Sequence, residues 1–123
     1  MNRLVLALLL LVSFSVSAKQ LPCSIHLAKG TPASALPGLA TISQADAQKT
    51  ALARVNASPN QVTDAELEIE KGCLVYSFDI RTTGKTGIEE LLVDAGTGRI
   101  LSHKHESPKQ EAAEQAKDKA SFK

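Results

Sequence analysis

The chain has 123 residues, of which 43% are hydrophobic and 3% aromatic, and its formal net charge is +1. This length is enough for one domain with a modest core and too short for two. A charge so near zero and so few aromatic side chains offer neither phosphate attraction nor a stacking platform, so we expect no nucleic-acid partner.

Residues 1–18 have the three parts of a secretory signal peptide. A short basic start ends at Arg3, an apolar run covers 4–12, and small residues lead to Ala18. The apolar run is far shorter than the roughly 20 residues of a membrane-spanning helix. We therefore predict cleavage after Ala18, a periplasmic or secreted protein, and no membrane anchor after cleavage.

The N-terminal arm, residues 19–41, contains three prolines and two glycines, so we expect it to be irregular. Within it, residues 23–27 alternate with period two, as in a short strand or an extended segment laid over the domain. The two cysteines of the chain are Cys23 and Cys73. In an exported chain they predict one disulfide, with two free thiols or a metal- or redox-active pair as the alternatives.

A helix is predicted to begin at Ser43 and to run to about Val55. Ser43 can accept a hydrogen bond from an early amide, and Asp46 suits the positive end of the helix. A narrow stripe of small apolar residues recurs at helical spacing, which lets a helix lie close to a sheet. The stripe consists of Ala47, Ala51, Leu52 and Val55.

Four antiparallel strands in a meander are predicted after this helix, at about 62–70, 74–80, 88–93 and 99–105. The heaviest apolar face belongs to the second strand, with Leu74, Tyr76, Phe78 and Ile80. The predicted fold class is therefore α+β, in which a single N-terminal helix packs on one face of a four-stranded antiparallel meander.

The second face of the predicted sheet also carries apolar side chains, including Val75 beside Cys73. Strands that are apolar on both sides are usually covered on both sides. We therefore expect the arm to pack there through Ile25 and Leu27. The alternative is that Val75, Ile25 and Leu27 form a partner-binding face, with the arm as a clasp.

Three short segments carry a resemblance to a known family: Glu66-Leu67, Val75-Tyr76, and the turn 93–101 that reads V-D-A-G-T-G-R-I-L. Together they resemble the PepSY domain over about 42–102, and we place that domain at 42–106. The resemblance implies one helix against a curled antiparallel sheet and a role in inhibiting or regulating peptidases at the cell envelope. No peptidase domain follows in this sequence, so any inhibition is expected to act in trans.

Residues 107–123 are rich in Glu, Lys, Ala and Gln, and we expect a flexible polar, charged tail that forms at most a frayed helix. Just before it, His103 and His105 share one face of a strand and are candidate metal ligands, with Glu106 or a tail carboxylate as a third. His26 is the only further imidazole. A polar strand end entering solvent is the simpler interpretation.

The remaining polar patterns do not predict catalysis. The acidic stripe of the first strand favours a solvated face over a calcium or basic-ligand site. Its members are Asp64, Glu66, Glu68 and Glu70. Glu89 and Glu90 point to opposite faces, so they are not a paired acid and base. No nucleophile with a neighbouring base is apparent, and we expect neither an enzyme nor a bound cofactor.

Two functions remain. The first is an exported non-catalytic binding module whose partner is a peptidase or another envelope protein, contacted through a sheet edge or the face near Cys73. The second is a small periplasmic metal-binding or stress-accessory protein that uses His103 and His105, with His26 as a further candidate ligand. A purely structural envelope protein is a third possibility. An exposed sheet edge could also pair with a second copy of the chain.

Overall fold

An antiparallel sheet with strand order β1-β2-β3-β4 forms the centre of the computed structural model, which describes residues 21–121. The signal peptide predicted for residues 1–18, with cleavage after Ala18, lies outside the described residues. The elements are η1 (Ala33–Gly38), α1 (Gln44–Val55), η2 (Pro59–Gln61), β1 (Val62–Glu70), β2 (Cys73–Ile80), β3 (Ile88–Asp94), β4 (Ile100–Glu106) and α2 (Pro108–Ser121). The predicted α+β meander is confirmed.

Helix α1 begins and ends where the sequence predicts. The Ser43 hydroxyl oxygen accepts a hydrogen bond from the Asp46 amide at 3.1 Å, which satisfies one of the unpaired amides of the first turn. Asn56 ends the helix in the left-handed conformation, with φ 51°. The small side chains Ala47 and Ala51 are fully buried, so the helix axis lies close to the sheet.

The main core lies between α1 and the sheet. Strand β2 contributes its alternate side chains Leu74, Tyr76, Phe78 and Ile80, as predicted. The apolar face of β1 joins them through Ala65, Leu67 and Ile69. The buried Tyr76 hydroxyl donates a hydrogen bond of 2.8 Å to the main-chain carbonyl of Ile42, so its polar atom is satisfied inside the core.

The N-terminal arm extends the sheet beside the start of β2. The Leu74 amide donates to the Ile25 carbonyl at 3.0 Å, and the Leu27 amide donates to the Gly72 carbonyl at 2.8 Å. The predicted disulfide joins Cys23 to Cys73. The position predicted for Ile25 and Leu27 is wrong, because both pack against the main core on the α1 side rather than on the second face.

The reason is a bend in the arm at Ser24. Strict alternation would place residue 23 on the same face as residues 25 and 27, but the bend breaks that pattern. Cys23 and Leu21 therefore reach the sheet face turned away from α1, which we call the outer face. There they pack with Leu101 against Cys73, Val75 and Leu92.

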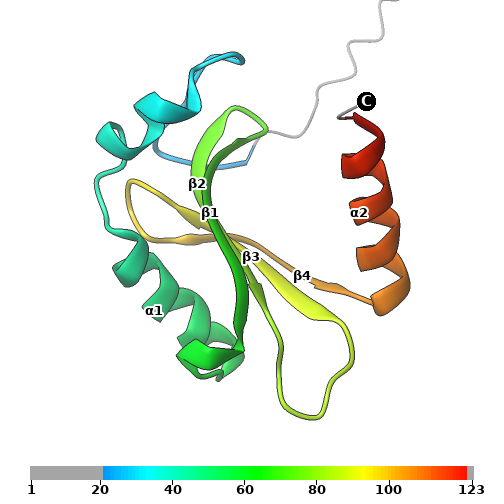
Figure 1. The fold of residues 1–123 in the computed structure, drawn as a ribbon. Coiled ribbons are helices and arrows are strands. Elements are labelled where there is room, and N and C mark those ends of the chain that lie inside the picture. The colour runs from blue at the N-terminus through cyan, green and yellow to red at the C-terminus, as the bar shows by residue number, and fades with distance from the viewer. Residues whose placement is uncertain (1–20, 122–123) are drawn as a thin grey trace, which may run out of the picture.

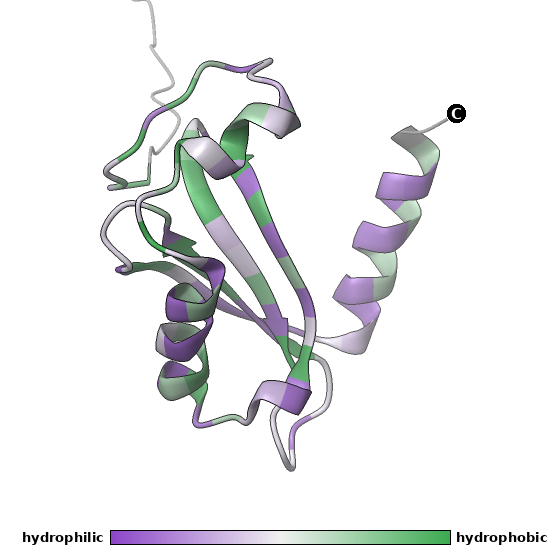
Figure 2. Cartoon of the chain, turned by 60° about the vertical axis from the view of Figure 1, so that its left-hand side comes forward, coloured by the Kyte–Doolittle hydropathy of each residue, from purple (hydrophilic) through white to green (hydrophobic). Residues whose placement is uncertain are grey.

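The C-terminal segment forms a regular helix, α2, where the sequence predicted a flexible tail. Ser107 caps it: the Gln110 amide donates to the Ser107 hydroxyl at 3.3 Å, and the Ser107 amide donates to the Gln110 side chain at 2.9 Å. This reciprocal arrangement is a capping box, followed by Pro108 at the first helical position. Figure 1 shows α1 and α2 on opposite sides of the sheet, and Figure 2 shows that α2 is hydrophilic over most of its turns.

None of the helices within residues 21–121 has the length and apolar character needed to cross a membrane.

Candidate functional site

A buried carboxylate, Glu89, is the centre of the most distinctive polar cluster. Glu89 lies near the start of β3 and is only 4% exposed. It shares the inner face of β3 with the core residues Leu91 and Val93, because side chains two apart along a strand point the same way. A charged group in this position needs polar partners.

Two imidazoles from β4 provide these partners. The strand register sets Glu89 opposite His105 and Leu91 opposite His103. His103 Nε2 lies 2.9 Å from Glu89 Oε2, and His105 Nδ1 lies 3.1 Å from Glu89 Oε1. A carboxylate can only accept, so each imidazole donates, and the carboxylate holds both rings at once.

The connection between β2 and β3, residues 81–87, forms the rim of this cluster. Gly87 has φ +80° and lies so close to the main chain of Glu106 that no Cβ atom would fit, which brings the connection beside β4. From it, Lys85 Nζ approaches Glu89 Oε1 to 3.7 Å. An open hollow of about 660 Å³ results, lined by Gly84, Lys85, Thr86, Glu89, His103 and His105.

The charge balance of the cluster favours an ionised Glu89. Burial acts to raise the pKa of this carboxyl, but the hydrogen bonds from His103 and His105 outweigh burial and lower it. The hollow therefore presents one fixed carboxylate, two imidazoles and one ammonium group. Such a set can bind a cation through its carboxylate and imidazole nitrogens.

A second polar cluster lies between the outer face and α2. A cleft of about 420 Å³ separates them and is lined by acidic residues of all four strands and of α2. Burial and neighbouring carboxylates raise the pKa of Glu68 and of Glu106 to about 7, and that of Asp79 to about 6. Burial also raises the pKa of Glu90. Near neutral pH the carboxyl groups of Glu68 and Glu106 are therefore only partly ionised.

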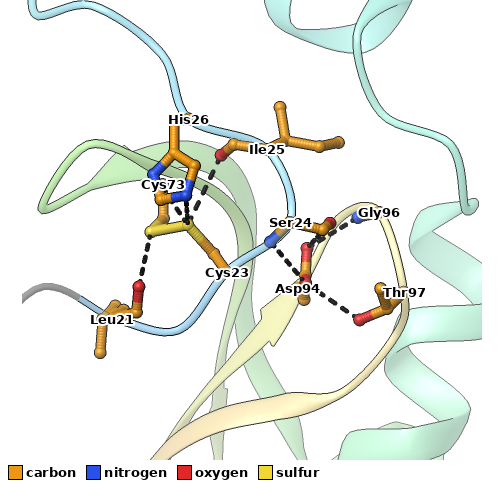
Figure 3. The surroundings of a disulfide bond; sticks show 9 residues. All are labelled: Leu21, Cys23, Ser24, Ile25, His26, Cys73, Asp94, Gly96 and Thr97. Atoms are coloured by element: carbon orange, nitrogen blue, oxygen red, sulfur yellow. Dashed lines mark hydrogen bonds between the residues drawn. A yellow bond between two sulfur atoms is a disulfide. The ribbon is translucent and has the colours of Figure 1, made fainter.

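The disulfide holds the arm across one end of the outer face (Figure 3). Beside it, the buried Asp94 carboxylate accepts hydrogen bonds from the Ser24 amide at 3.0 Å and the Ser24 hydroxyl at 2.8 Å. It also accepts from the Gly96 amide at 2.9 Å and the Thr97 hydroxyl at 2.9 Å. Burial acts to raise the pKa of Asp94, but these bonds outweigh it and lower the pKa. Asp94 thus ties the arm to the β3–β4 turn.

The structure brings His103 and His105 together, but not with the partners that the sequence suggested. Glu106, proposed as a third ligand, lies on the outer face near Glu90 and Glu114 instead. His26 lies beside the disulfide, with Nδ1 3.6 Å from Cys23 Sγ. The sequence places Glu89 on one face of β3, but its contacts with His103 and His105 were not predicted. Only the β3–β4 register shows which residues it contacts.

Groups of three metal-ligating side chains whose donor atoms all lie within 4.8 Å of one another occur twice in the described residues. One consists of Cys23, His26 and Cys73, whose sulfur atoms are joined in the disulfide. The other consists of Glu90, Glu106 and Glu114. The donor atoms of Glu89, His103 and His105 are spread more widely than those of either group, because each imidazole contacts a different oxygen of the Glu89 carboxylate.

The candidate partner face is not accessible as predicted. Val75 is fully buried beneath the arm, and Ile25 and Leu27 belong to the opposite side of the sheet. The three residues therefore do not form one continuous surface.

A comparison with protein families identifies one match. The model for PepSY, described as peptidase propeptide and YPEB domain, matches residues 41–104, more than half of the chain. These bounds include α1, β1, β2, β3 and most of β4. No curated protein and no solved structure shows significant similarity to the chain.

Proposed function

This chain belongs to the PepSY family, and from that premise we propose that it is a non-catalytic binding module that regulates or inhibits a peptidase or another envelope protein in trans. The observation that carries the proposal is the family match over residues 41–104, the helix and sheet that form the main core. The disulfide is consistent with an oxidising compartment, and we place the protein in the periplasm or outside the cell.

The cysteine and histidine side chains already contact other groups of the protein, which supports binding over catalysis. Both cysteines are bonded to each other. His103 and His105 donate to Glu89, and His26 lies against the disulfide sulfur. A nucleophilic mechanism needs a hydroxyl or thiolate hydrogen-bonded to a base, and these contacts commit the imidazoles and thiols elsewhere.

The edge of β1 is the surface that best suits a protein partner. The outer face is covered by the arm at one end, and α2 lies across the cleft at the other. Strand β1 lies at the edge of the sheet and pairs with β2 on one side. An extended segment of a partner can add to such an edge through main-chain hydrogen bonds. The exposed Asp64 and Glu66 would favour a segment with basic side chains.

Site-specific photo-crosslinking in cells tests this proposal. A photoreactive residue replaces the exposed Glu66 on β1, and a matched control replaces the exposed Lys49 on α1. We expect a peptidase or other envelope protein to be captured at position 66 and not at 49. Capture of the same proteins at both positions, or at neither, would contradict the proposed surface.

A further inference from the structure

We propose that Glu89, His103 and His105 form a binding site for a divalent transition metal ion, with Zn²⁺ and Cu²⁺ as the ions that fit best. The proposal concerns the open hollow beside the β2–β3 connection. It goes beyond the binding-module function and does not rest on it.

The donor set matches the chemistry of these ions. Imidazole nitrogen and carboxylate oxygen are ligands that Zn²⁺ and Cu²⁺ share, and two histidines with one glutamate form a known set for an open zinc site. With metal–ligand bonds of about 2.0 Å, two ligand atoms of a tetrahedral site lie about 3.3 Å apart. The two nitrogen–oxygen distances in the cluster, 2.9 and 3.1 Å, are near that spacing, but they lead to different oxygens of Glu89. Since the three residues do not bring one donor atom each within 4.8 Å of one another, the imidazole rings must turn to bind one ion. A bound ion would replace the protons that the imidazoles now donate.

The cluster combines one fixed ligand with two adjustable ones. Glu89 is held in the buried face of β3, and its side chain is 6% exposed. The side chains of His103 and His105 are 33% and 45% exposed, so their rings can turn without moving the strands. The two nitrogens contact opposite oxygens of Glu89, and binding one ion requires the exposed rings to close toward a common point.

The surroundings leave room for an ion and for water. The hollow of about 660 Å³, which the β2–β3 connection helps to line, is open to solvent. Lys85 is the cation nearest to Glu89, at 3.7 Å, and its side chain is 65% exposed. This ammonium group can swing into solvent when a metal ion neutralises the carboxylate.

Calorimetric titration of the untagged, metal-free mature protein with Zn²⁺ and, separately, Cu²⁺ tests the site. We expect one ion per chain, binding at least tenfold weaker in Glu89→Gln, and loss of this binding in the His103→Ala/His105→Ala double variant. His26→Ala is the matched control for the third imidazole, and Glu114→Gln is the control for the acidic cleft. Both controls should bind as the wild type does.

Electron paramagnetic resonance of the Cu²⁺ complex gives a second readout. Coupling to imidazole nitrogens should be present in the wild type and absent in the double variant. The His103→Gln/His105→Gln variant keeps a hydrogen-bond donor for the buried Glu89 at both positions and removes both imidazoles, so it remains decisive if Glu89→Gln or the double alanine variant fails to fold. The proposal is overturned if the wild type binds neither ion, or if binding is lost in His26→Ala or Glu114→Gln rather than in the double variant.

Discussion

The disulfide is expected to supply a large part of the stability of this small domain. Replacing Cys23 and Cys73 by alanine releases a cross-link between positions 50 residues apart. The chain-entropy relation gives about 4 kcal/mol at 25 °C for a loop of that size. Domains of this size have about 5–15 kcal/mol of stability in total. The double variant should therefore keep only about 1–11 kcal/mol of stability.

Urea unfolding followed by circular dichroism measures the loss. With a slope of about 2 kcal/mol per molar urea, the midpoint should fall by about 2 M. Ser24→Ala is the matched control, because it keeps the disulfide and removes only the 2.8 Å hydrogen bond to Asp94, which should cost about 1 kcal/mol. A loss of less than about 1 kcal/mol in the double alanine variant would refute the loop-entropy argument.

Three further predictions concern buried or half-buried polar groups. Asp94→Asn should cost about 2 kcal/mol in urea unfolding at pH 7, because it weakens charge-assisted hydrogen bonds; an unchanged midpoint would contradict this. Folding raises the pKa of Glu68 and of Glu106 to about 7 and that of Asp79 to about 6. Above about pH 4.5 the native state therefore binds more protons than the unfolded chain does. Stability should therefore fall as pH rises from 5 to 8, by about 2 kcal/mol after allowance for solvent screening, and less in Glu68→Gln; a rise would show the sign to be wrong. Tyr76→Phe should cost about 1 kcal/mol in the same unfolding assay, because it leaves a core carbonyl without its donor.

The local and periodic features of the fold were predictable from the sequence. Ser43 and Asp46 mark the start of α1, and the alternation of β1 separates its apolar side from its acidic side. These features depend on residues a few positions apart, which the sequence displays directly. The disulfide could also be predicted from the sequence, because the chain has only two cysteines.

Features that depend on long-range register were not predictable in the same way. The contact of Glu89 with His103 and His105 requires the β3–β4 pairing, which includes an irregularity between Leu92 and Val93. The path of the arm depends on the bend at Ser24, which Asp94 stabilises from 70 positions away. Without those contacts, simple alternation places Ile25 on the wrong side.

Helix α2 was missed for a different reason. Its alanine stripe is too narrow to predict burial, and isolated helices of this length are marginal in water. The local signal was Ser107-Pro108-Lys109-Gln110, which has the spacing of a capping box with proline at the first helical position. The cap fixes the start of the helix, and Glu111 then reaches Arg81 at 3.5 Å.

The most direct test of the proposed function is the activity of the peptidase captured at position 66, measured while the purified mature protein is titrated into the assay. We expect activity to fall in a saturable way and to recover when Glu66→Arg replaces the wild type, because the substitution reverses charge at the β1 edge. Lys49→Glu on α1 is the matched charge reversal and should inhibit as the wild type does. Peptidase activity that stays unchanged when the peptidase is saturated with the wild-type protein would contradict the regulator account.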